Sequence, residues 1–105
     1  MADRSMSSQI THVWVFNGEQ SHLPNAVFLS LELAETGIKK KGVSGILTAY
    51  PINTSVYEWA IQNGVFRPKH SYQNLPEFIQ RFTSASLEHY HYENGKNCDD
   101  SNERA

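Results

Sequence analysis

Two histidines separated by a single residue form the pattern with the clearest potential for chemistry. His89 and His91 fall within the segment LEHYHYENG. Residues i and i+2 of a β-strand point to the same side, so these imidazoles could meet one metal ion, joined by His12 if its strand were a neighbour. Zinc needs three or four ligands, and no cysteine or carboxylate is spaced to complete the set. We therefore interpret His89 and His91 as residues of a partly solvated sheet face, in preference to a metal site or an acid–base pair. We expect no metal and no cofactor.

The neighbouring tyrosines point to the opposite side of the same strand. Tyr90 and Tyr92, together with Glu88, could line a polar groove or a protein interface, since tyrosine combines apolar area with a polar tip. The alternative is that they are ordinary half-buried strand residues. The sequence thus offers five surface candidates for binding, which are His12, His89, Tyr90, His91 and Tyr92.

Further aromatic residues gather where a helix is expected. Tyr57 and Trp59, with Tyr50 and Pro51 just before them, could form a pocket for a flat ligand. An aromatic stripe at helical spacing is more often packed inside a protein, so we interpret this group as core.

Residue patterns for catalysis are missing elsewhere in the chain. Ser44, Ser55 and Ser71 have no G-x-S-x-G context, and Cys98 lies in a polar C-terminal segment where no base would be held beside it. No pair of carboxylates is placed for glycoside hydrolysis, and no glycine-rich loop precedes a helix. These gaps favour a protein that is not an enzyme, without deciding the matter.

Alternating apolar and β-branched residues predict one sheet. The first strand is apolar on both sides, with Trp14 and Phe16 on one and Val13 and Val15 on the other. We therefore expect either helices on both sides of the sheet or a homodimer that buries the second face. The predicted strands span residues 12–16, 26–29, 43–50 and 87–92, with a short edge strand at 65–66.

Capping signals predict three helices. The first follows Ser30 and ends with a basic turn before Gly42. The second begins at the capping box of Ser55 and Glu58 and is apolar enough to be largely buried, and a third lies within residues 75–82. The order ββαβαβαβ predicts an α+β domain, with a four- or five-stranded, mainly antiparallel sheet and two or three packed helices.

Composition limits the class of protein. The chain of 105 residues suits one domain, expected at 11–94 between a disordered N-terminal tail (1–10) and a disordered acidic C-terminal tail (95–105). Nine basic and eleven acidic residues leave no electropositive footprint for nucleic acid. One cysteine cannot form an internal disulfide, and no apolar stretch could span a membrane. We expect a soluble, cytoplasmic protein.

Five segments resemble a family of small bacterial single-domain proteins that is classed as a domain of unknown function. The resemblance covers about residues 12–95 and implies a stand-alone domain. It implies no reaction, cofactor or catalytic residue. The segments are HVWVFNG (12–18), LPNAVF (23–28), SGILTAYP (44–51), VYEWAIQNGVFRP (56–68) and LEHYHYENG (87–95).

Two functional interpretations follow from these observations. The first is a non-enzymatic protein-binding or accessory module of the immunity type, whose mild acidity would suit a basic partner. The second is a small ligand- or metal-binding protein or enzyme with a cleft of His12, His89 and His91. The missing catalytic patterns favour the first. We expect another protein as partner, or a second copy through the sheet face, and neither nucleic acid nor membrane.

Overall fold

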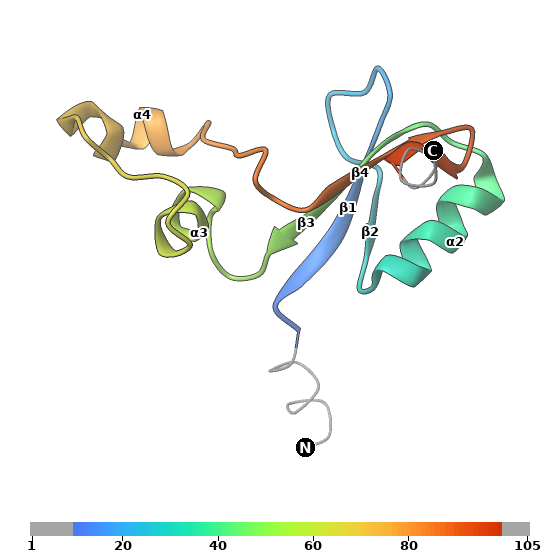
Figure 1. The fold of residues 1–105 in the computed structure, drawn as a ribbon. Helices are drawn as coiled ribbons and strands as arrows, with labels where there is room; N and C mark the ends of the chain where they lie inside the picture. Colours follow the sequence, from blue (N-terminus) through green and yellow to red (C-terminus); the bar gives the residue numbers. More distant parts are fainter. Residues whose placement is uncertain (1–9, 100–105) are drawn as a thin grey trace.

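One antiparallel sheet organises the protein (Figure 1), and the computed structural model describes residues 10–99. The strands lie in the order β2-β1-β3-β4-β5, and every neighbouring pair is antiparallel. This arrangement confirms the predicted α+β fold. The strands are β1 (His12–Gly18), β2 (Ala26–Phe28), β3 (Gly45–Pro51), β4 (His89–Glu93) and β5 (Lys96–Asn97).

Helix α2 (Leu31–Lys41) begins and ends where the sequence indicated. The Ser30 hydroxyl accepts a hydrogen bond from the N–H of Leu33 at 3.1 Å. Gly42 stops the helix with a φ of 65°, a left-handed conformation that costs glycine little. The basic run Lys39–Lys41 fills the last turn, where positive charge is favoured beside the terminal carbonyls.

The hydrophobic core lies between α2 and one face of the sheet. Ala34 and Ile38 of the helix belong to the same buried cluster as Leu47 and Ala49 of β3. The sheet contributes three further residues to this cluster, which are Trp14, Phe16 and Tyr92.

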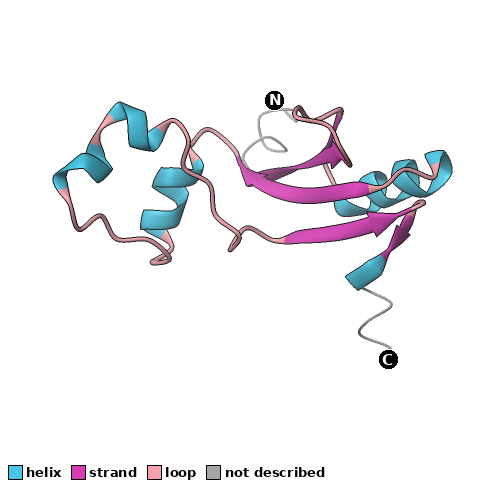
Figure 2. Cartoon of the chain, turned by 90° about the horizontal axis from the view of Figure 1, so that it is seen from above, coloured by secondary structure: helices cyan, strands magenta, loops and turns pink. Residues whose placement is uncertain are grey.

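A second cluster of side chains is aromatic and belongs to the segment beyond one end of the sheet. The helices of that segment lie on the opposite side of the molecule from α2 (Figure 2). Its centre is Tyr57, whose hydroxyl donates to the carbonyl oxygen of Gln73 at 2.7 Å. The ring centroid of Phe82 lies 5.5 Å from that of Tyr57 and 4.7 Å from that of Phe66. We call residues 52–86 the helical lobe. It contains α3 (Val56–Gln62), the 3₁₀ helix η1 (Ser71–Asn74) and α4 (Pro76–Ile79).

Val65 and Phe66 do not form the predicted edge strand. Their N–H groups both donate to the carbonyl of Ala60, at 2.9 and 3.2 Å, so the chain wraps around the end of α3. The Phe66 ring then stacks on Phe78 in the helical lobe, with 5.9 Å between the ring centroids. Packing of this ring outweighs the local strand propensity of the pair.

The chain after Asn94 returns to the sheet. Asn94 and Gly95 have φ values of 51° and 84°, and two successive positive values are what a type I′ hairpin turn requires. The turn brings Asn97 into register with Tyr92 and creates β5. The predicted start of a tail at residue 95 is corrected by this strand. The remaining residues of the two predicted tails, 1–9 and 100–105, lie outside the described residues.

Candidate interaction surface

The face of the sheet opposite α2 is left uncovered by the helices of residues 10–99. Pairing in register places alternate residues of each strand on this face. Its side chains are half-buried or exposed, whereas every buried strand residue lies on the α2 side. Val27 is 63% exposed and Ile46 is 41% exposed. We call this surface the open face, and it consists of Val13, Val15, Asn17, Val27, Ile46, Thr48, Tyr50, His89 and His91.

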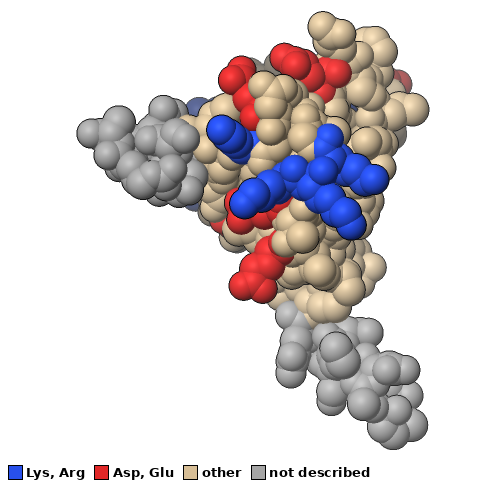
Figure 3. Space-filling model, turned by 90° about the vertical axis from the view of Figure 1, so that its right-hand side faces the viewer, with Lys and Arg blue, Asp and Glu red and all other residues tan. Residues whose placement is uncertain are grey.

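The open face carries no lysine, arginine, aspartate or glutamate among its residues as defined. Charged residues lie at its edge: Glu93 follows His91 on the same side of β4, opposite Lys96, and Asp99 Oδ2 lies 3.5 Å from His91 Nδ1. Basic side chains instead gather on another side of the molecule (Figure 3), where Lys39–Lys41 end α2. The uncharged middle and charged edge resemble the usual division of a protein interface into an apolar core and a polar rim.

Two hollows flank Ile46 on the open face. One has a volume of about 240 Å³ and lies between β3, β4 and the segment 83–87. Thr48, Tyr50, Ala85 and His89 contribute to its walls. The other, of about 420 Å³, lies at the far end of the sheet beside the loop that follows β1. The surface is therefore not flat: one aliphatic side chain stands between two depressions.

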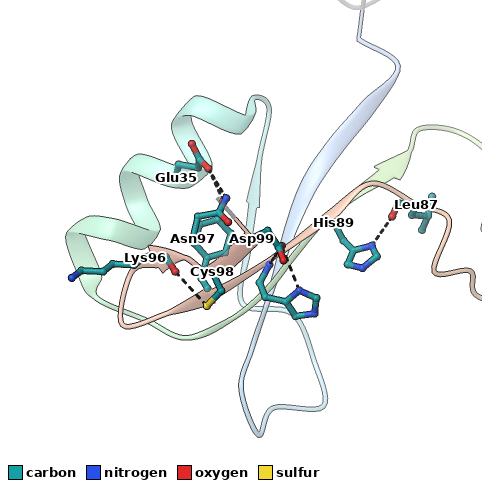
Figure 4. A network of polar contacts seen from close by, with 9 residues as sticks. Glu35, Leu87, His89, Lys96, Asn97, Cys98 and Asp99 are labelled. Carbon is teal, nitrogen blue, oxygen red and sulfur yellow. Dashed lines mark hydrogen bonds and ion pairs between the residues drawn. The ribbon is translucent and has the colours of Figure 1, made fainter. Parts of the chain in front are cut away.

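His89 and His91 share the open face, as their spacing predicted. Their ring centroids are 5.6 Å apart. His89 Nδ1 lies 2.7 Å from the carbonyl oxygen of Leu87, so this nitrogen carries the proton and donates (Figure 4). His91 Nδ1 lies 3.5 Å from Asp99 Oδ2, and the same oxygen accepts from the His91 backbone N–H at 2.8 Å. Both rings are thus oriented by local partners.

His12 does not join the other two histidines. Strand β3 separates β1 from β4, and His12 lies on the α2 side of the sheet, 5.5 Å from the Trp14 ring. The hypothesis of a cleft formed by His12, His89 and His91 is therefore wrong. Within residues 10–99, no group of three or more histidine, cysteine, aspartate or glutamate side chains is placed to hold a metal ion.

The two tyrosines of β4 support the core and do not line a groove on the open face. Tyr92 is only 3% exposed, so its prediction as a surface residue is wrong, and its hydroxyl donates to Glu35 Oε2 at 2.8 Å. Burial, and next the adjacent Glu35 carboxylate, raise the pKa of the Tyr92 phenol far above its ordinary value. Tyr90 is half-buried, stacks on Trp14 at 6.1 Å and donates to the Glu88 carboxylate.

Cys98 lies in the folded part of the protein, whereas the sequence placed it in a tail. It is half-buried, and its thiol lies 3.9 Å from the carbonyl oxygen of Lys96, a weak contact (Figure 4). Cys98 and His91 line the same hollow. The Asn94-Gly95 turn is the sequence signal that could have revealed this, because such a pair predicts a returning strand.

Comparison with known families decides the membership of the chain. Residues 13–98 match a family described as a domain of unknown function, DUF7710. The protein belongs to the DUF7710 family. No curated protein and no solved structure matches it. The matched residues include all five strands of this DUF7710 protein except the first residue of β1, and therefore almost the whole open face.

Proposed function

We propose that this DUF7710 protein is a non-enzymatic protein-binding module and that the open face is its binding surface. One observation carries the proposal: a five-stranded sheet has one face buried by α2, whereas the other presents aliphatic side chains that α2, α3 and α4 leave uncovered. The role fits an accessory or immunity-type protein, which acts by covering part of another protein. We further propose a cytoplasmic location, which suits a chain with a single cysteine.

The composition of the open face supports binding over simple exposure to water. A solvated sheet face normally carries polar side chains between the buried ones, giving a clean alternation along each strand. Here aliphatic side chains, those of Val13, Val15 and Ile46, take three of these positions, beside polar ones such as Asn17 and Thr48. Covering apolar surface is favourable by about 25 cal/mol per Å², so a partner with a matching surface would gain from the contact.

No helix in the described part of the chain is long and apolar enough to cross a bilayer.

A protein partner suits the shape of the open face, because its two hollows are shallow depressions beside a protruding Ile46. Hydrophobic side chains of a partner protein could fill such depressions while the strands remain unchanged.

Photochemical cross-linking in cells of the source organism tests this proposal. A photoreactive benzoylphenylalanine replaces Ile46 in one variant and Leu75 in another; the two side chains are 41% and 50% exposed, but Leu75 belongs to the helical lobe. We expect discrete protein adducts from position 46 and none of the same mass from position 75. No adduct from position 46, or the same adducts from both positions, would contradict a binding role for the open face.

A further inference from the structure

We infer that the open face binds a second copy of this chain, so that two sheets pack face to face around a two-fold axis. This inference rests on the proposed function, because it names the occupant of the same surface. It follows from three properties of the open face: its shape complements itself, the strand positions around Thr48 carry no lysine, arginine, aspartate or glutamate, and its area suits a weak dimer.

Self-complementarity is visible in the placing of Ile46 and the smaller hollow. Both lie on the open face, with Ile46 near one end of β3 and the walls Thr48 and Tyr50 further along the same strand. Consider a two-fold axis that lies in the interface and crosses β3 near Thr48. This axis would place Ile46 of each copy over the hollow of the other. The two sheets would then lie about 10 Å apart, the usual spacing of packed sheets. The hollow of about 240 Å³ is large enough for an isoleucine side chain.

Charge also favours a second copy. Around a two-fold axis each surface meets itself, so any charged residue near the axis would face the same charge. No lysine, arginine, aspartate or glutamate lies at the strand positions around Thr48, whereas Glu93 and Asp99 lie toward one end of the face, beside His91.

The area of the open face is that of a weak, transient interface. Three strands of up to seven residues cover roughly 24 Å by 14 Å, or about 350 Å² of projected surface per copy, at ordinary strand dimensions. Side-chain relief, Val27 and the segment 83–87 add to this figure. The surface buried on both copies together remains near or below about 1,200 Å², the lower limit of stable interfaces. We therefore expect a weak dimer with rapid exchange of subunits.

Sedimentation equilibrium of the full chain between about 1 and 500 µM tests the dimer. The wild type should shift from one chain mass to two across this range. Ile46→Lys should weaken the dimer at least about tenfold, because it would bury a charge in the interface. Leu75→Lys, a matched change on the helical lobe, should leave it within about twofold. A wild type that stays monomeric at the highest concentration, or an Ile46→Lys dimer of unchanged strength, would overturn the inference.

Cysteine cross-linking tests the orientation of the two copies. In a Cys98→Ser background, chains with Ile46→Cys are mixed with chains with Ala85→Cys and oxidised. We expect a disulfide-linked pair that contains one chain of each kind, and none when Leu75→Cys replaces Ala85→Cys. Equal linking in both mixtures would overturn the proposed packing. If the chain stays monomeric while position 46 still gives photo-adducts of other masses, the dimer fails and the protein-binding function stands.

Discussion

The hydroxyl of Tyr92 bonds to a carboxylate that lies 57 residues earlier in the chain. Asn97 also donates to this oxygen, Glu35 Oε2, at 3.3 Å, so one carboxylate joins α2 to β4 and β5. The alternation HYHY correctly placed Tyr92 on the opposite side from the histidines. It could not identify Glu35, because a contact between distant residues depends on how α2 packs.

Replacing Tyr92 by phenylalanine should lower the free energy of unfolding by about 1.5 kcal/mol near pH 7, since a buried bond to a charged group is lost. The change should also remove part of the alkaline sensitivity. The pKa of Tyr92 is raised above the ordinary 10.0, chiefly by burial. Above about pH 10 the unfolded tyrosine therefore loses its proton while the folded one keeps it, and stability falls by up to about 1.4 kcal/mol per pH unit.

Urea denaturation between pH 7 and pH 11 measures both effects. Tyr72→Phe is the matched control, because the Tyr72 side chain is 55% exposed. The Tyr72→Phe variant should retain the alkaline loss, and the Tyr92→Phe variant should show a smaller one. Parallel pH profiles for these two variants would show that Tyr92 does not titrate differently in the folded state.

Gly45 marks the tightest approach between strands. Its φ is +156°, and a Cβ there would overlap the backbone oxygen of Asn17 and come 2.8 Å from Phe16 Cζ. We expect Gly45→Ala to destabilise the fold by at least about 3 kcal/mol. Gly42→Ala has a positive φ but open space around its Cβ, and should cost only about 1 to 2 kcal/mol. Thermal unfolding of both variants checks this, and equal losses would rule out the overlap.

Secondary-structure elements were predicted best where a local signal marks their ends. Ser30 and Gly42 bound α2, and Ser55 accepts from the N–H of Glu58 at 3.0 Å at the start of α3. The errors have the opposite cause. Val65 and Phe66 have strand propensity, but both N–H groups bond to the end of α3 and the Phe66 ring packs into the aromatic cluster. The conformation of short segments without capping residues therefore depends on long-range packing, which the local sequence does not indicate.

The helical lobe should open independently of the sheet, because its buried cluster is separate from the core under α2. Tyr57 holds the lobe through its hydroxyl bonds to Gln73 and Asn74, at 2.7 and 3.1 Å. Tyr57→Phe should speed hydrogen exchange of the α3 amides about tenfold, equivalent to roughly 1.4 kcal/mol, and leave β3 amides unchanged.

Mass-spectrometric hydrogen exchange provides the measurement, with Tyr72→Phe in the same lobe as the control. Tyr72 is 55% exposed, so its exchange pattern should match that of the wild type. Equal acceleration in α3 and β3 would mean that the lobe and the sheet unfold together.

At the scale of the whole molecule, the sequence predicted two apolar sheet faces but not which of them is covered. The alternation in β1 and β3 established both faces, since period-2 patterning depends only on local sequence. The position of α2 and the order of the strands decide the rest, and both arise from long-range pairing. His89 and His91 were therefore placed correctly relative to each other, whereas His12 was grouped with them in error.

Association through the open face should make thermal stability depend on protein concentration. A dimer that forms only from folded chains stabilises them by mass action, so the wild-type Tm should rise as concentration increases from about 5 to 500 µM. Ile46→Lys removes the aliphatic side chain that fills the partner hollow and weakens the dimer, so its Tm should rise less over the same range. Leu75→Lys should follow the wild-type slope. Differential scanning calorimetry of the three proteins makes the comparison, and a flat wild-type profile would mean that the open face of the folded chain stays unpaired in solution.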